Sequence, residues 1–462
     1  MATGDAKRLG KHPVALAVLA ATELAERFSY YGMTALLALY MVKQLLRPGH
    51  ADHVLGLAAL RHVFEFRGAM SNEAFASLIY GWYGGLVYFT PLMGGWIADR
   101  WLGTRRTVAL GALLMAAGHL AMSMDATFLF ALVLLIIGSG FLKGNISAQV
   151  GSLYPKDAES LRERGFTIFS TAINIGAVAG PIGTGTIGLV YGWHAGFALA
   201  AALMLVALVV YLIGSRHLPA RLPGAQEKAK LPPLSRDERT RAWTIAGVIA
   251  LLVPVNVTYT MIWNIGVVWV DQHVDLQSPL GRVPASWFNS VDSFASILVA
   301  PVLIFLWARQ ARVGREPTSI AKIAIGALIT GLSGLILAAG CLTAGADGKV
   351  SVLWPLAGWF GMGVGFMWYW PITLALVSRA APAKVNATLI GATFLALFFG
   401  STIMGWVGSF YDQMSNSAFW TLDAAISLAS GIVVLALKGP VTRILEPPPR
   451  ETSIQTGLSF QC

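Results

Sequence analysis

The stretch TELAERFSYYG, residues 22–32, places three ionisable side chains inside an apolar segment that covers residues 13–42. The three are Glu23, Glu26 and Arg27. On insertion scales, an acid or an arginine at the centre of a membrane helix costs about 2.5–3.5 kcal/mol. Residues of this kind face the interior of a helix bundle or a water-filled cavity, and they mark functional sites. The stretch therefore predicts a membrane-embedded helix bundle with charges at its centre.

Helical spacing puts the polar side chains of this stretch on one face. Positions 23, 26, 27, 30, 31 and 34 follow i, i+3, i+4, i+7, i+8 and i+11, which is the repeat of one helix face. Glu23 and Arg27 are also spaced for an i, i+4 ion pair. We expect this face to line the interior of the bundle, and it carries Glu23, Glu26, Arg27, Tyr30, Tyr31 and Thr34.

The composition of the whole chain agrees with a membrane protein. Only 12% of its 462 residues are charged, against about 25% in soluble domains. Apolar segments of about 20 residues recur, each long enough to cross a hydrocarbon core of about 30 Å. The net charge of +10 does not indicate nucleic-acid binding, because the basic residues lie in connections on alternate sides, as the positive-inside rule expects. With Cys341 and Cys462 as its only cysteines, the chain has no disulfide framework or four-cysteine metal site.

Twelve membrane helices are predicted, six on each side of a polar segment. That segment, residues 215–241, is rich in proline and holds seven lysines and arginines, which is typical of a cytoplasmic connection. We expect a cytoplasmic N-terminus over 1–12, six-helix bundles over 13–214 and 242–440, and a cytoplasmic tail over 441–462. The expected spans are residues 13–42, 73–98, 105–123, 127–150, 165–190, 194–214, 242–270, 287–309, 318–341, 351–378, 385–411 and 416–438.

The segment GGWIADRWLGTRR, residues 94–106, resembles the signature Gly-x-x-x-Asp-Arg-x-Gly-Arg-Arg of the major facilitator superfamily, with one extra residue before Gly103. The resemblance implies an all-α integral membrane fold of two six-helix bundles that rock around a site at the membrane midplane. It also implies a conformational latch. In this latch Gly95 permits close helix approach, and Asp99 with the arginines fastens helix ends on the cytoplasmic face. The latch residues are Gly95, Asp99, Arg100, Arg105 and Arg106.

Two more charges lie deep in predicted spans. Lys143 occurs in SGFLKGNISAQ, and Asp292 occurs in WFNSVDSFAS, where Asn289 precedes it by one turn. With the three charges of the first span they sum to minus one. Two cations facing three carboxylates could share or release one proton and stay nearly neutral, as a proton-coupled carrier requires. A static ion-pair network that only fixes helix packing is the alternative.

The segment ELAERFSYYG resembles the Glu-x-x-Glu-Arg-Phe-x-Tyr-Tyr-Gly motif of the proton-dependent oligopeptide transporter (POT/PTR) family. The resemblance extends through IYGWYGGLVYFTPLMGGWIADRWLG, FLKGNISAQVGSLY, GFTIFSTAINIGAVAGP and VPASWFNSVDSFASILVAP. It implies proton-coupling roles for Glu23, Glu26, Arg27 and Lys143. It also implies peptide contacts, and these fall on Tyr30, Tyr31, Asn174 and, in the seventh span, on or near Trp263.

The chain departs from the pattern of this family at positions that bear on the substrate. Thr34 stands where the family usually has an arginine, and Val267 stands where it usually has the acid that pairs with this arginine in the outer gate. Phe366 replaces the tenth-span glutamate, Ser170 replaces a fifth-span tyrosine, and Asp292 replaces an eighth-span asparagine. A carboxylate is thus gained in the second half near where another is lost.

Two interpretations of the substrate site follow. In the first, Asp292 receives a substrate ammonium while Lys143 and Arg27 receive a carboxylate. In the second, the pocket accepts a bulkier, less polar peptide-like compound that stacks on the aromatic run 366–370, although aromatic residues are also typical of membrane interfaces. The predicted substrate-binding residues are Tyr30, Tyr31, Thr34, Lys143, Ser170, Asn174, Trp263, Asn289, Asp292, Phe366 and Tyr369.

The sequence thus predicts a proton-coupled symporter of small peptides or peptide-like compounds that works by alternating access. The alternatives are the same fold adapted to a bulkier peptide-like natural product, taken up or exported, and a non-transporting membrane receptor. An enzyme is not expected, because no nucleophile faces a base and no metal site is present. The partners expected are the substrate, protons and the lipid bilayer, with no nucleic acid and no cofactor beyond the proton gradient. We expect a functional monomer in the bacterial inner membrane, with both termini cytoplasmic.

Overall fold

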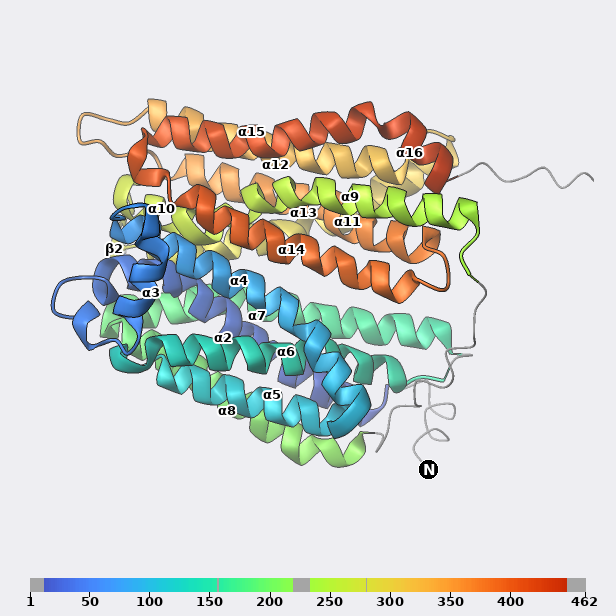
Figure 1. The fold of residues 1–462 in the computed structure, drawn as a ribbon, viewed down its shortest axis with the longest axis horizontal. Coiled ribbons are helices and arrows are strands. Elements are labelled where there is room, and N and C mark those ends of the chain that lie inside the picture. The colour runs from blue at the N-terminus through green and yellow to red at the C-terminus, as the bar shows by residue number, and fades with distance from the viewer. Residues whose placement is uncertain (1–11, 156–157, 219–232, 280, 447–462) are drawn as a thin grey trace, which may run out of the picture.

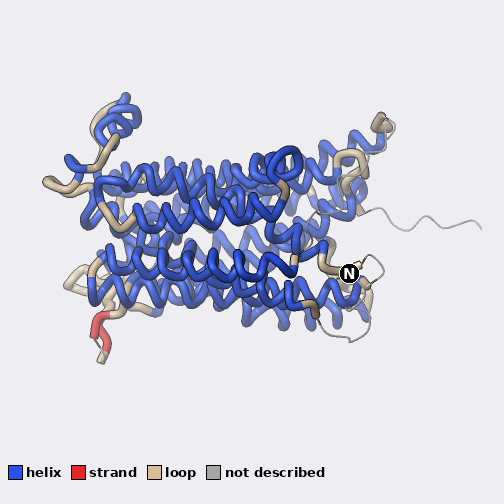
Figure 2. The backbone as a smooth tube through the Cα atoms, turned by 90° about the horizontal axis from the view of Figure 1, so that it is seen from below, coloured by secondary structure: helices blue, strands red, loops and turns tan. Residues whose placement is uncertain are grey.

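The computed structural model describes residues 12–155, 158–218, 233–279 and 281–446. Most of these residues are helical, and the long helices run roughly parallel to one another (Figure 2). The predicted N-terminal segment 1–12 except His12, the middle of the predicted linker and the C-terminal tail beyond residue 446 lie outside the described residues.

Six long helices form the first half of the fold, in the lower part of Figure 1. Their bounds lie within a few residues of the predicted spans, and a short helix, α3 (Leu57–Phe64), lies in a connection where no helix was expected. The long helices are α2 (Val14–Tyr40), α4 (Asn72–Ile97), α5 (Thr104–Ala121), α6 (Phe128–Ser152), α7 (Glu159–Tyr191) and α8 (Trp193–Gly214).

The second half lies above the first in Figure 1 and again has six long helical segments. Its first segment, residues 236–273, is divided into α9 and α10 by the π-helical turn η7 (Ile262–Gly266). A short antiparallel strand pair follows α10, which the sequence analysis did not expect. The elements are α9 (Arg236–Met261), α10 (Val267–His273), β1 (Gln277–Ser278), β2 (Gly281–Arg282), α11 (Val291–Arg312), α12 (Ser319–Leu342), α13 (Leu353–Ala380), α14 (Asn386–Gly408), α15 (Asn416–Ala436) and the short α16 (Lys438–Leu445).

Nine helical segments in the described part of the chain are long and apolar enough to cross a membrane. The long helices α2, α4 and α5 are not among them. In α2 the reason is the charged stretch at residues 23–27, and in α5 it is Arg105, Arg106 and His119. Helix α4 is instead rich in glycine, tyrosine and tryptophan. These three helices belong to the first half, which is therefore less apolar than the second.

The two halves meet along α4 and α14 and also where α7 packs against the 3-10 turn η8 (Ala285–Ser290). Polar contacts between the halves gather at the end that carries α3, α10 and β2 in Figure 1, here called the α3 end. Ser77 Oγ donates a hydrogen bond to Gly405 O at 2.9 Å, and Ser290 Oγ donates one to Val178 O at 2.7 Å. The described conformation is therefore closed at the α3 end.

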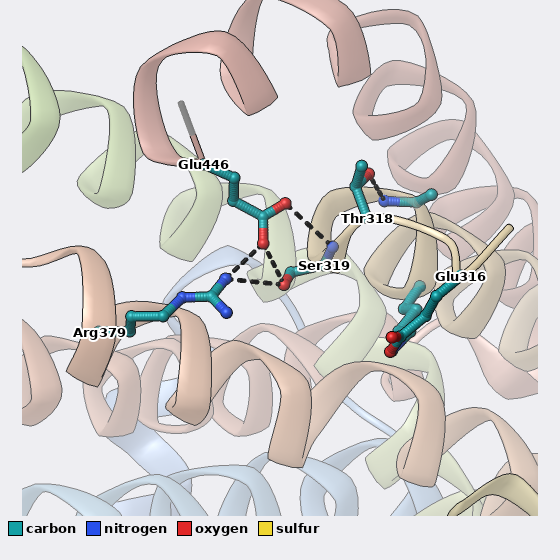
Figure 3. Close-up of polar contacts among 7 residues, drawn as sticks. Glu316, Thr318, Ser319, Arg379 and Glu446 are labelled. Carbon is teal, nitrogen blue, oxygen red and sulfur yellow. Dashed lines mark hydrogen bonds and ion pairs between the residues drawn. The ribbon is translucent and has the colours of Figure 1, made fainter. Parts of the chain in front are cut away.

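A polar clasp holds the opposite end of the second half, here called the α16 end (Figure 3). The Glu446 carboxylate, just past α16, accepts hydrogen bonds from the backbone N–H of Ser319 at 3.1 Å and from Ser319 Oγ at 2.6 Å. It also forms an ion pair with Arg379 in the last turn of α13. A carboxylate at a helix N-terminus satisfies free backbone N–H groups and the helix dipole. The clasp thus ties the end of the described chain to the ends of α12 and α13.

Close approach between α4 and α6 depends on Gly94 rather than on Gly95, and this corrects the role assigned to Gly95 in the predicted latch. A Cβ atom added at Gly94 would lie 2.1 Å from Gly140 O, whereas one added at Gly95 would meet nothing within 4 Å. Small residues let membrane helices pack backbone against backbone. The glycine that matches the signature, Gly95, is therefore next in sequence to the glycine that makes the contact, Gly94.

We expect the substitution Gly94→Leu to lower the free energy of unfolding by about 1–3 kcal/mol, because its side chain has no room against α6. The matched control is Gly95→Leu on the same helix, which should unfold close to wild type. Thermal unfolding in detergent measures both. Equal melting temperatures for the two variants would show that α4 and α6 can separate without cost.

Candidate functional site

The charged stretch of α2 forms one compact cluster at Arg27. Arg27 Nε donates a hydrogen bond to Glu23 Oε1 at 2.7 Å and lies 2.9 Å from Glu26 Oε2. Glu23 and Glu26 are at most 1% exposed. Glu23 Oε2 has no hydrogen-bond partner within the described part of the chain. The expected i, i+4 pair is thus confirmed, and one guanidinium serves two buried carboxylates.

Lys143 of α6 reaches the same helix but not the carboxylates. Its Nζ lies 4.0 Å from the centre of the Tyr30 ring and 5.3 Å from that of Tyr88 on α4. Among the described residues it has no ion pair within 4.0 Å. A cation over an aromatic face is held by the ring quadrupole, more strongly where water is excluded. In this conformation Lys143 is therefore held by aromatic rings and not by a carboxylate.

The polar face of α2 continues across the boundary between the halves. The rings of Tyr30 and Tyr31 meet edge to face at 5.2 Å, and Tyr31 lies 5.4 Å from the Trp263 ring. Trp263 stands in η7, the π-helical turn in the first segment of the second half. Turns of this kind are frequent at functional sites because they redirect side chains. The contact between Tyr31 and Trp263 therefore joins the polar face of α2 to the second half.

Asp292, at the start of α11, is the buried acid on the second-half side. It is 1% exposed, its Oδ2 accepts a hydrogen bond from Tyr259 OH at 2.8 Å, and its Oδ1 has no partner in the part of the chain that the structure describes. The Tyr259 ring stacks on Phe366 at 5.0 Å with 22° between the planes. Phe366 stacks in turn on Trp370 at 6.3 Å. The Asp292 carboxylate thus lies at one end of a row of aromatic rings, formed by Tyr259, Phe366 and Trp370.

Three other residues of the predicted site are occupied by bonds to the protein. Thr34 Oγ1 donates to the carbonyl of Tyr30 on its own helix at 2.9 Å. Asn289 Oδ1 accepts a hydrogen bond from Trp359 Nε1 at 3.2 Å, and Tyr369 OH donates one to Asn256 Oδ1 at 3.1 Å. Asn289 keeps a free amide, because its Nδ2 has no partner among the described residues.

Ser170 and Asn174, in contrast, are exposed on α7. Within the described part of the chain, no hydrogen bond joins either of them to the Arg27 cluster, to Lys143 or to Asp292. They lie in the part of α7 toward the α16 end, before Gly176, which packs against Leu24 and Arg27. Their place in a site remains a prediction.

The residues of the predicted latch gather where α4 ends and α5 begins, through the π-helical turn η4 (Ala98–Leu102). Asp99, Arg100 and Arg106 are exposed there. Arg105 Nη2 donates a hydrogen bond to Ser215 Oγ at 3.3 Å, so it reaches the end of α8.

Asp423 on α15 is a buried acid that the sequence analysis missed. It is fully buried, and neither of its carboxylate oxygens has a hydrogen-bond partner among the described residues. Its backbone carbonyl accepts a hydrogen bond from Thr258 Oγ1 on α9 at 2.6 Å. The five deep charges predicted from the sequence therefore omit one acid. The signal was present, because Asp423 is a lone charge in the apolar run WTLDAAISLASG.

Comparison with known proteins places this geometry in a family. The sequence profile of the POT family (PTR2) matches residues 105–231 and 234–426. The chain belongs to the POT family. It is a helical membrane transporter and not an enzyme, and the recognition, fold class and non-enzyme predictions are confirmed.

Relatives and solved structures agree over nearly the full length. A di-/tripeptide transporter of Lactococcus lactis subsp. cremoris is 28% identical over 94% of this chain and 96% of its own. The peptide transporter YePEPT of Yersinia enterocolitica is 26% identical over 94% and 95%. The crystal structure of a peptide transporter POT in complex with sulfate has a TM-score of 0.83 at 26% identity, covering 94% of this chain and 96% of that one.

We expect Arg27→Gln to lower the free energy of unfolding by about 3–5 kcal/mol at neutral pH, because it leaves two buried carboxylates without their cation. Adding Glu23→Gln and Glu26→Gln should restore most of the loss, since no carboxylate without a cation then remains on α2. Lys143→Gln is the control, because it breaks no ion pair. Thermal unfolding in detergent measures all variants, and an Arg27→Gln protein as stable as Lys143→Gln would contradict the prediction.

Proposed function

We propose that this chain is a proton-coupled symporter of small peptides or peptide-like compounds, working by alternating access in a bacterial inner membrane. The observation that carries the proposal is the Arg27 cluster. In this cluster Arg27 forms ion pairs with two carboxylates, and a second cation, Lys143, lies nearby over the Tyr30 ring. Family membership supports the substrate class, since relatives are named as peptide transporters.

The net charge of the Arg27 cluster gives a way in which it couples protons to transport. With both acids ionised, Arg27, Glu23 and Glu26 carry one negative charge, which attracts Lys143. When one acid takes a proton, the cluster becomes neutral and Lys143 is released from that attraction. Lys143 is then available for the carboxylate of a substrate, and loss of the proton draws it back. Binding of proton and substrate is linked because both act on the same two cations.

Asp292 receives the ammonium group of the substrate in this proposal. Its unpartnered Oδ1 offers an acceptor, and Tyr259 holds Oδ2 in place. We place both termini in the cytoplasm, the α16 end at the cytoplasmic face and the α3 end at the outer face. The described conformation is then closed at its outer face. The six-helix bundles over 13–214 and 242–440 are the bodies that rock, and the carrier works as a monomer.

A second candidate function is transport of a bulkier, less polar peptide-like compound. It is favoured by the stacked series of Tyr259, Phe366 and Trp370, which offers flat apolar surface beside Asp292. One solved structure of a mutant POT peptide transporter, 27% identical to this chain with a TM-score of 0.82, contains alafosfalin, a peptide-like ligand.

The Glu23→Gln and Glu26→Gln variants should lose accumulation of a labelled dipeptide in proteoliposomes under an inward proton gradient, while wild type concentrates it. Both should keep gradient-independent exchange of the dipeptide, because the fold and the other site residues remain. The control is Glu65→Gln, a partly exposed acid paired with Arg61 outside the site. Concentrative uptake by both variants would remove the cluster from coupling. No uptake by folded wild-type protein would overturn the dipeptide assignment and call for the same assay with larger apolar compounds.

Asp292→Asn should raise the KM for a free dipeptide about tenfold or more, as expected when a charge-assisted hydrogen bond to the substrate ammonium is lost. The KM of wild type for the N-acetylated dipeptide should already be high and should change little in the variant. Inhibition of labelled uptake by each compound measures both. An equal loss for the two compounds would assign Asp292 a structural role.

A further inference from the structure

A cavity of about 350 Å³ lies at the α3 end, with walls from both halves. The first half contributes Leu36, Leu189 and Trp193 among others. Among the described residues, its only charge in the lining is Lys43 in η1 (Met41–Leu45), the turn that continues α2. The second half contributes Asp271 of α10 and Arg282 of β2. The cavity therefore lies at the seam that must open when the halves rock apart.

One carboxylate at this seam is shared by two cations. Asp271 Oδ2 forms an ion pair with Lys43 Nζ, and Asp271 Oδ1 accepts a hydrogen bond from Arg282 Nη2 at 3.0 Å. The Arg282–Asp271 pair stays within the second half, whereas the Lys43–Asp271 pair joins the two halves. The side chains of Lys43 and Arg282 are 35% and 44% exposed, so both are within reach of a solute.

This pair lies further toward the α3 end than the neutral residues Thr34 and Val267. Lys43 follows Thr34 by nine residues, or about 14 Å of helix, and Asp271 follows Val267 by about one turn. Thr34 and Val267 are both buried and carry no charge. The charged contact between the first and seventh spans is thus at the mouth of the protein rather than deeper inside.

The charges of the lining favour an anion. Two cations and one acid give the described lining one positive charge in excess, and the other described residues of the lining are uncharged. Lys43 can exchange its partner without leaving a bare acid behind, because Asp271 keeps Arg282. An arriving carboxylate can therefore take Lys43 and separate the halves at little electrostatic cost. Leu36, Leu189 and Trp193 offer apolar surface to the rest of the solute.

We infer that this cavity is an outer binding site for the carboxylate of an incoming peptide, and that the Lys43–Asp271 ion pair is the outer gate which that carboxylate opens. The inference rests on the proposed function for the peptide. The gate itself rests only on the contact between the halves.

The first test compares a dipeptide with its C-terminal amide in proteoliposomes. Lys43→Gln should raise the KM for the free acid about threefold, the effect of one exposed ion pair. It should leave the KM for the amide unchanged. The matched control is Arg61→Gln, which breaks an ion pair at the same end but within the first half. Equal KM values for the free acid in Lys43→Gln and Arg61→Gln would overturn the carboxylate site.

The second test follows the gate without any substrate. In a chain with Cys341→Ser and Cys462→Ser, Ser286→Cys puts a thiol in the cavity lining, where the serine is 1% exposed. A membrane-impermeant maleimide on intact cells should label it several-fold faster after Lys43→Gln. The conservative change Lys43→Arg should keep labelling slow, because it preserves the ion pair with Asp271 and leaves the Arg282–Asp271 pair intact. Equal rates in Lys43→Gln and Arg61→Gln would overturn the gate. If wild type takes up no dipeptide, the proposed function fails, and the labelling still decides the gate.

Discussion

The pairing of buried charge at Arg27 is the constraint on which the arrangement of the first half depends. A guanidinium and two carboxylates in one helix cannot face lipid, so α2 must be enclosed on its polar side. Glycines of α7 provide the enclosure. A Cβ at Gly176 would lie 2.6 Å from Leu24 O, and one at Gly180 would lie 2.5 Å from Phe28 O. The backbone of α7 therefore lies directly on α2 beside the cluster, and α8 packs on both helices.

The contacts between the halves near the α3 end include hydrogen bonds to the backbone. Near the α3 end, side-chain hydroxyls of one half bond to backbone carbonyls of the other, as Ser77 does with Gly405 and Ser290 with Val178. Bonds to backbone groups do not depend on protonation. In the proposed transport cycle, any dependence on protonation therefore falls to charged side chains such as those of the Arg27 cluster.

Much of the fold and part of the site followed from sequence because their signals are local. The twelve long helices followed from runs of apolar residues, and the Arg27 pair followed from spacing along one helix. What escaped depends on contacts between distant segments. Lys43 looked like one basic residue among several in a connection, and only the fold brings it to Asp271. Gly94 and Gly95 are neighbours in sequence but differ in what faces them. Asp423 was readable as a lone acid, yet its isolation became visible only when α9 and α15 were packed around it.

The clasp at Glu446 has a consequence for how motion in this protein can be observed. Since the carboxylate is bonded to the first residue of α12 and to the last turn of α13, residue 446 moves with the second half and not as a loose chain end. A fluorophore attached next to it would act as a pointer fixed to that half. Paired with a second fluorophore near the start of α2, it would report the proposed rocking of the two halves as a change of energy-transfer efficiency.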